Sequence, residues 1–147
     1  MELAEIGKNI LTNCMNVKPG ENVLIVTDDE KYAIGQALYQ AAKLLKAEAM
    51  LMTMPAREVS GQEPPAVVAA SMKAADVVIC PMKTSITHTR AKIEAAEAGA
   101  RIATMPGITE EMFAMGAMTA DYSRVMALTE QVTDLLTNAN TARIEKD

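Results

Sequence analysis

The sequence predicts an α/β domain, a Rossmann-like three-layer fold with a mainly parallel sheet of about four strands. Short apolar runs alternate along the chain with segments of helical periodicity. The runs are continuously apolar, as parallel strands are when helices cover both faces of their sheet. The connections between runs are long enough for right-handed crossovers through a helix. We therefore expect residues 1–147 to form a single α/β domain.

The first half of the chain is expected to contain three helices and two strands. Apolar residues recur at helical spacing in three segments, at 3–14, 34–45 and 67–72. Lys18-Pro19-Gly20 ends the first of these helices, and Pro64-Pro65 begins the third, which should end before Asp76. The two predicted strands are the apolar runs at residues 23–26 and 49–52.

The second half should add two strands and three helices. Strands are predicted at residues 77–80 and 101–105, with an Ala-rich helix between them that stops at Gly99. A short helix at 110–115 and a long one should follow. In the long helix, periodicity predicts a buried stripe formed by Val125, Leu128, Val132 and Leu135.

The last residues, 141–147, resemble the start of a further extended segment. The loops that follow the predicted strands also lack a complete catalytic set. We expect this chain to be the amino-terminal domain of a longer, two-domain protein, and a flexible natural tail is the alternative explanation of its last residues.

Composition excludes several classes of partner. The net charge is −5, and the Lys and Arg residues form no basic stripe, so no nucleic-acid partner is expected. No apolar stretch reaches the roughly 18 residues of a membrane span, and the first residues lack a signal peptide, so we expect a cytoplasmic protein without membrane contact. Cys14 and Cys80 are too few for a disulfide framework or zinc cage, and both are expected to be buried thiols.

The loop after the first predicted strand argues against a nucleotide site. Thr27-Asp28-Asp29-Glu30 stands where a dinucleotide fold carries G-x-G-x-x-G, and its three carboxylates would repel a phosphate. Paired acids could instead hold Mg²⁺, as in phospho-acceptor receiver domains, but the third strand ends in Cys80-Pro81-Met82-Lys83 without the required Asp. Asp28 or Asp29 is therefore expected to cap the following helix.

The loop at 84–90 is the candidate ligand-binding site. Its hydroxyls, free backbone N–H groups and guanidinium could together hold a carboxylate or a phosphate. The candidate residues are Thr84, Ser85, Thr87, His88, Thr89 and Arg90. A purely structural interpretation stays open beside it, in which Thr87 caps the next helix and Arg90 meets a surface acid.

No catalytic or metal-binding residue is predicted in this chain. His88 is the only histidine, and no acidic cluster has ligand spacing. As a general base, His88 would have only unactivated hydroxyls beside it. The segment from Met105 to Met118 is rich in Met, which suits either core packing or a contact surface for another domain or subunit.

Four stretches of the chain resemble the amino-terminal domain of the thermophilic (leucyl) aminopeptidases, metallopeptidases of the aminopeptidase T and S type. They are Gln62-Glu63-Pro64-Pro65, Thr87-His88-Thr89-Arg90-Ala91, Ala103-Thr104-Met105-Pro106-Gly107-Ile108-Thr109 and Ala120-Asp121-Tyr122. The resemblance implies a two-domain homodimer that removes amino-terminal residues from peptides. It also implies two divalent ions, Zn, Co or Mn, held by the missing carboxy-terminal domain, so that this chain alone would hold no cofactor and be inactive.

The same two-domain plan is similar to that of the ring-opening 2,5-dihydroxypyridine dioxygenases, which use iron in the corresponding second domain. Three hypotheses therefore remain open from the sequence: a non-catalytic aminopeptidase domain, the amino-terminal domain of such a dioxygenase, and a small-anion binding or association module.

Overall fold

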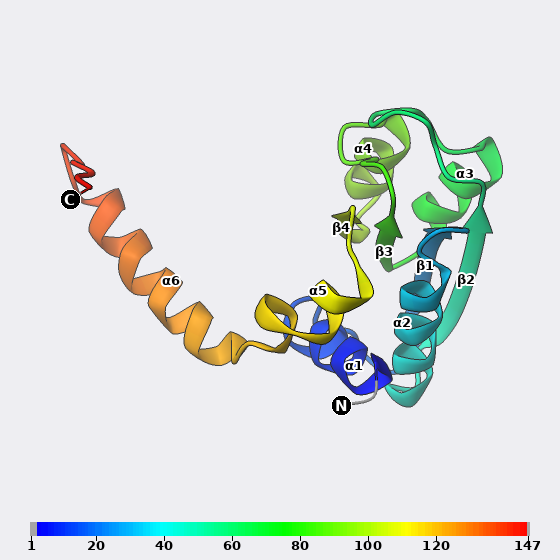
Figure 1. The fold of residues 1–147 in the computed structure, drawn as a ribbon, viewed down its shortest axis with the longest axis horizontal. Coiled ribbons are helices and arrows are strands. Elements are labelled where there is room, and N and C mark those ends of the chain that lie inside the picture. Colours follow the sequence, from blue (N-terminus) through cyan, green and yellow to red (C-terminus); the bar gives the residue numbers. More distant parts are fainter. Residues whose placement is uncertain (1–2, 147) are drawn as a thin grey trace.

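The computed structural model of the protein describes residues 3–146. Within them, helices and strands alternate as the sequence predicted (Figure 1). The elements are α1 (Leu3–Asn13), β1 (Asn22–Asp28), α2 (Tyr32–Leu44), β2 (Glu48–Met54), α3 (Ala66–Ala74), β3 (Val77–Met82), α4 (Arg90–Glu97), β4 (Arg101–Pro106), α5 (Glu110–Ala114), the 3₁₀ helix η1 (Gly116–Thr119) and α6 (Tyr122–Thr137).

The four strands form one sheet in the order β2-β1-β3-β4, and every neighbouring pair is parallel. Helices α1, α2 and α5 pack on one face of the sheet, and α3 and α4 pack on the other. This arrangement confirms the predicted three-layer, Rossmann-like fold.

The central strands form the buried middle of the domain. Every residue of β3 is buried, as is every residue of β1 after Asn22. The edge strands β2 and β4 are only partly covered. The continuously apolar runs that predicted β1 and β3 therefore reflect burial on both faces.

Two glycines shape the connections. A Cβ on Gly35 in α2 would lie 2.8 Å from Cγ2 of buried Thr27, so glycine allows α2 to rest against the end of β1. Gly99 has φ +104° and follows the C-cap of α4, which confirms the predicted helix end.

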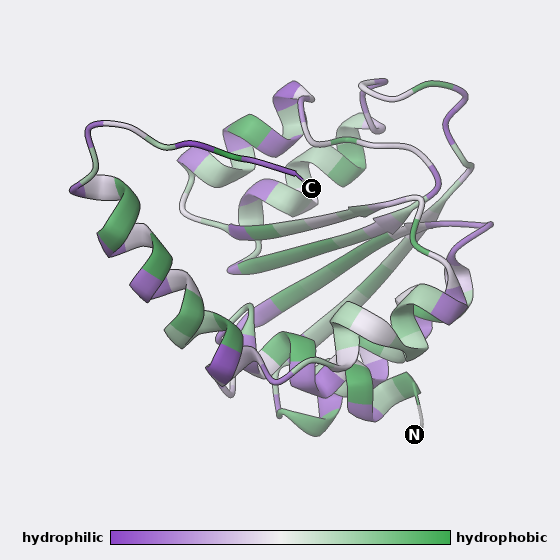
Figure 2. Cartoon of the chain, turned by 60° about the vertical axis from the view of Figure 1, so that its left-hand side comes forward, coloured by the Kyte–Doolittle hydropathy of each residue, from purple (hydrophilic) through white to green (hydrophobic). Residues whose placement is uncertain are grey.

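The long helix forms as α6, but the predicted burial of its four apolar residues is wrong. Val125, Leu128, Val132 and Leu135 are 46%, 51%, 53% and 73% exposed, and no residue of α6 is buried. The helix extends away from the layered body, and apolar bands mark it (Figures 1 and 2). Periodicity predicted the helix correctly, but the described chain provides no surface against which its stripe packs.

Several smaller expectations are corrected or limited. Cys80 is buried as predicted, but Cys14 is exposed because it lies just past the end of α1. In the Met-rich segment, Phe113 is fully buried while Met112 and Met115 are exposed. Residues 141–146 form no strand, and Asp147 lies outside the described residues. No helix in the described part of the chain is long and apolar enough to cross a membrane.

Candidate functional site

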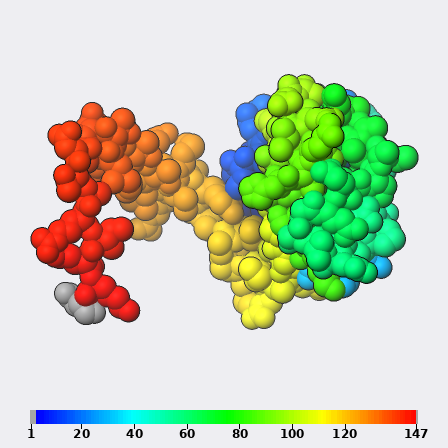
Figure 3. All heavy atoms as spheres, turned by 90° about the horizontal axis from the view of Figure 1, so that it is seen from above, coloured from blue at the N-terminus to red at the C-terminus, as the bar shows by residue number. Residues whose placement is uncertain are grey.

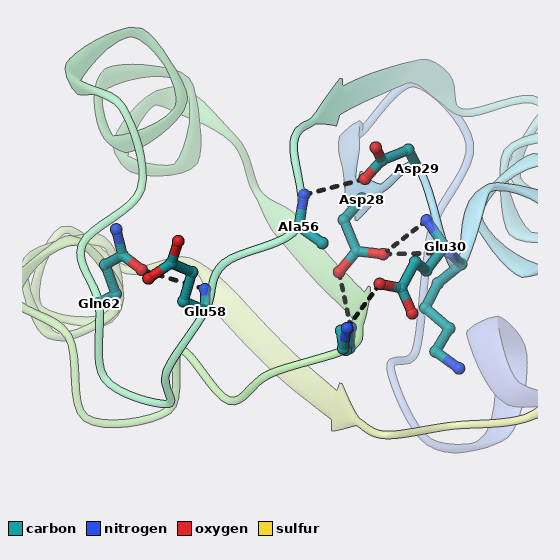
Figure 4. Close-up of polar contacts among 8 residues, drawn as sticks. Asp28, Asp29, Glu30, Ala56, Glu58 and Gln62 are labelled. Atoms are coloured by element: carbon teal, nitrogen blue, oxygen red, sulfur yellow. Dashed lines mark hydrogen bonds and ion pairs between the residues drawn. The ribbon is translucent and has the colours of Figure 1, made fainter.

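Asp28 lies at the carboxyl end of β1 and is fully buried. Its Oδ1 accepts hydrogen bonds from the backbone N–H groups of Glu30 (3.1 Å) and Lys31 (3.0 Å), and its Oδ2 accepts from the N–H of Lys83 (2.6 Å) (Figure 4). One carboxylate therefore joins the loop after β1 to the loop after β3.

The prediction that Asp28 or Asp29 caps α2 is wrong. The N-cap of α2 is Lys31, and no side chain caps it. Asp28 and Asp29 lie one turn too early, at the strand end, and both carboxylates accept from loop N–H groups. The loop from β1 to α2 is longer than the capping hypothesis required.

The other two acids of this loop hold neighbouring loops in place. Asp29 Oδ1 accepts from the N–H of Ala56 in the loop after β2 (2.9 Å). Lys83 Nζ donates to Glu30 Oε1 at 2.7 Å, and this hydrogen bond is the main cause that raises the pKa of Lys83. Three consecutive acids thus connect the ends of β1, β2 and β3 (Figure 4).

The hydroxyls of Ser85 and Thr87 bond to each other and to β4. Ser85 Oγ donates to Thr87 Oγ1 (2.9 Å), and Thr87 Oγ1 lies 2.9 Å from Thr104 Oγ1 on β4. The Ser85 N–H donates to Ser60 Oγ, and the Gly61 N–H donates to the Ser85 carbonyl. These hydrogen bonds join the long loop after β2 to the loop after β3, although β1 lies between those two strands in the sheet.

Helix α4 is capped by Thr89, which corrects the expectation that Thr87 caps it. Thr89 Oγ1 accepts from the N–H of Lys92 and donates to the Ile86 carbonyl. Glu63 adds a second cap, since its two carboxylate oxygens accept from the N–H groups of Arg90 (2.6 Å) and Ala91 (3.3 Å). The N-terminus of α4 is thus occupied by the protein's own side chains.

The structure brings only part of the predicted ligand site together. The side chains of His88 and Arg90 are exposed, and Arg90 pairs with Glu94 at 3.4 Å. Thr84 Oγ1 is buried without a hydrogen-bond partner among the described residues, as is Arg57 Nε in the loop after β2. Sequence reasoning missed both Arg57 and Glu63. For Glu63 no local signal exists, because it acts on a residue 27 positions away.

Metal-ligand geometry is absent from the described residues: among 3–146, no three His, Cys, Asp or Glu side chains gather where they could hold an ion. Burial raises the pKa of the Cys80 thiol to about 12, so this thiol is not a nucleophile at neutral pH. A hollow of about 670 Å³ does exist, but it runs along the edge strand β2, and its wall contains no charged residue.

Fold and site together define the class of protein: a Rossmann-like α/β domain whose polar groups at the carboxyl edge of the sheet hold its loops together. The particular family follows from comparison. The family model of NicX, 2,5-dihydroxypyridine 5,6-dioxygenase, matches residues 2–147. The chain belongs to this family.

A solved structure has a similar fold. The 2,5-dihydroxypyridine dioxygenase from Pseudomonas putida KT2440 superimposes with a TM-score of 0.57 at 18% identity. The match covers 71% of this chain and 33% of that one, so the matched part of this chain corresponds to about a third of the length of that enzyme. No curated protein matches the sequence.

These findings correct the first hypothesis from the sequence. The four resembling stretches pointed to an aminopeptidase domain, but the matched family is that of the dioxygenase, which was the alternative. The aminopeptidase, protease and hydrolase interpretation is therefore wrong. The same two-domain plan had been noted for both families, and the quoted stretches alone did not separate them. The iron expected for such an enzyme has no fitting donor set among residues 3–146.

Proposed function

We propose that this chain is the non-catalytic amino-terminal domain of a ring-opening dioxygenase that acts on a dihydroxypyridine. The observation that carries the proposal is the family match, which extends over residues 2–147. The solved dioxygenase supports a role as one part of a larger enzyme, since the similarity covers 33% of that chain.

The carboxyl edge of the sheet supports the non-catalytic role. Ligands of α/β domains usually bind there, beyond the strand ends. In this chain Asp28 accepts three backbone hydrogen bonds at that edge, and Glu63 accepts two. Carboxylates used in this way fix loop geometry and are not free to bind a metal or a substrate.

The remaining expectations belong to the same proposal. A divalent metal, iron in place of the Zn, Co or Mn of the discarded hypothesis, would be held by residues outside this chain. The substrate would be an aromatic ring in place of a peptide, and a second copy of the chain is the expected protein partner. A cytoplasmic location is supported by the two free cysteines, which suit a reducing compartment.

Oxygen uptake tests this proposal directly. The 147-residue chain and the complete product of its reading frame are each incubated with Fe²⁺ and 2,5-dihydroxypyridine. We expect uptake with loss of the substrate's absorbance for the complete product alone. Turnover by the 147-residue chain would refute the non-catalytic role, and a complete product inactive on dihydroxypyridines would refute the dioxygenase role.

The small-anion site at residues 84–90 is a second candidate function. The hydroxyl of Thr84 favours it, because it is buried without a hydrogen-bond partner among the described residues. Burying such a group costs the folded state about 1–3 kcal/mol, and a bound anion would supply the missing partner. Thermal unfolding with added phosphate or acetate tests it. We expect a rise in Tm for the wild type that Arg90→Ala abolishes and Lys73→Ala, on α3, retains. No rise in the wild type would leave the loop a structural element.

A further inference from the structure

One face of the edge strand β2 is only partly covered by a helix. Helix α2 packs on one side of β2, and on the other side α3 packs mainly on β1, so that only Met52 and Met54 of β2 join the cluster that contains α3. Met50 is 42% exposed there, although β1 and β3 are covered. The hollow of about 670 Å³ runs along this strand, and it is lined by Asn22, Leu24, Tyr39, Ala49, Met50, Leu51, Met52, Ser71, Ala74 and Ala75. We call it the β2 groove.

Helix α6 has the complementary feature, an apolar face that no sheet or helix covers in the described chain. Val125, Leu128, Val132, Leu135 and Leu136 lie within an arc of about 100° on the helix, the width that a sheet-covering helix presents. We call these five residues the α6 stripe. Glu130 and Asp134 lie on the opposite side of the helix, so the stripe is as free of charge as the β2 groove.

The two surfaces are similar in length. The α6 stripe spans 12 residues of the helix, about 18 Å, and the 7 residues of β2 span about 23 Å. Alanines at positions 49, 74 and 75 leave room in the groove for larger side chains. The α6 stripe can therefore lie along most of β2.

The helix of the same chain does not reach this position. The start of α6 lies beside Cys14, at the end of α1, and shares a hollow with it. From there α6 extends away from the body, on the side opposite β2 (Figures 1 and 3). A copy of α6 from another molecule has no such restriction.

We propose that two copies of this chain exchange their α6 helices, so that the α6 stripe of each covers the β2 groove of the other. A helix footprint of this length buries on the order of 400 Å² on each side of a contact, and two reciprocal contacts bury about 1,600 Å², the size of a stable interface. A two-fold axis makes the two contacts identical and closes the assembly. This inference does not depend on the proposed function.

Sedimentation velocity of the 147-residue chain over a concentration series tests the exchange. We expect a reversible dimer of twice 15.7 kDa. Val132→Glu in the stripe and Met50→Glu in the groove should each weaken the dimer at least about tenfold, because both place a carboxylate in an apolar contact. Ile93→Glu on α4 is the matched control, since Ile93 is 46% exposed and belongs to neither surface.

Mixing the two weakened variants distinguishes exchange from helix pairing. A Val132→Glu copy keeps a good groove, and a Met50→Glu copy keeps a good stripe. The mixture should therefore regain one of two contacts and form more dimer than either variant alone. Circular dichroism checks that each variant is folded.

Three outcomes would overturn the proposal. The first is a wild-type chain that stays monomeric or grows into open chains. The second is a dimer insensitive to Met50→Glu, which would mean that the α6 helices pair with each other. The third is a mixture that shows no recovery.

Discussion

The helices of the layered body and α6 have the same helical spacing of apolar residues, but these residues are buried in the body and exposed in α6. In the body, apolar residues at helical spacing in α1 and α2 are buried against the sheet. In α6, the same spacing produces a stripe that is half exposed or more in most of its residues. Figure 3 shows that α6 touches the body only at its start and then extends away from it. Periodicity therefore determines which face of a helix is apolar, but a partner surface determines whether that face is buried.

The difference has an energetic consequence. The body owes its stability to burial, at about 25 cal/mol for each Å² of apolar surface. An isolated helix of 16 residues lacks this contribution and is marginally stable in water. Truncation of an apolar side chain to alanine should therefore have unequal effects in the two regions.

The largest contrast is expected between Phe113 and Leu135. Phe113 is fully buried and anchors α5 to the core formed with α1 and α2, so Phe113→Ala should lower the free energy of unfolding by about 3–5 kcal/mol. Leu135→Ala, measured in dilute solution, should change it by less than about 0.5 kcal/mol. Urea unfolding measures both, and equal losses would refute the contrast between body and helix.

A smaller loss is expected where α2 meets β1. A Cβ at position 35 would lie 2.8 Å from the side chain of Thr27, which is held by its hydrogen bond to the Pro81 carbonyl. Gly35→Ala should therefore cost about 1–3 kcal/mol, despite the better helix propensity of alanine. Gln36→Ala, one residue further on and exposed, is the control. A stabilised Gly35→Ala protein would show that α2 does not rest on β1 as described.

The carboxyl edge gives a third test inside the body. Asp28 accepts three backbone hydrogen bonds and is buried, whereas Asp29 accepts one in an exposed position. Asp28→Asn should cost about 1–3 kcal/mol and Asp29→Asn less than about 1 kcal/mol. Equal costs in urea unfolding would mean that Asp28 does not hold the loops together.

The smallest effect concerns the amino-terminal ends of the strands, opposite the carboxyl ends where Asp28 lies. Arg101 donates to Glu21 at 2.6 Å, and this hydrogen bond is the main cause that lowers the pKa of Glu21 below its ordinary value of 4.5. The folded state therefore gains stability that is fully present above that value and is lost as the pH falls through the lowered pKa. The gain should be below about 1 kcal/mol, because both side chains are partly exposed.

Comparison of the wild type with Glu21→Gln isolates that effect. The difference in unfolding free energy should shrink as the pH falls below about 4.5. A difference that grows with acidity would have the wrong sign for this ion pair.

Local signals were sufficient to predict the sheet and the elements of the body. Continuous apolar runs predicted β1 and β3, and Gly99 predicted the end of α4, because these depend on burial and backbone conformation near each residue. The capping of α4 by Glu63 could not be predicted, because it joins loops far apart in sequence. The exposure of α6 was missed for a related reason, since no local pattern states whether a partner surface exists.

The candidate site was predicted less well than the fold. Residues at 84–90 do form one polar loop, and Thr87 and Ser85 lie within it as expected. The directions of His88 and Arg90 were not predictable, because they depend on where α4 begins relative to Thr89. The family was reached only as the alternative hypothesis, since the four stretches that carried the resemblance did not separate the two enzyme classes.

Hydrogen–deuterium exchange of the wild-type chain at low and high protein concentration tests the contrast between the two regions most directly. Amides of β1 and β3 should exchange slowly at both concentrations, because they open only with global unfolding. Amides of α6 should exchange rapidly in dilute solution and become protected, together with those of β2, as the concentration rises. Slow exchange of α6 in dilute solution would contradict the account, because it would mean that the helix is already covered within a single chain.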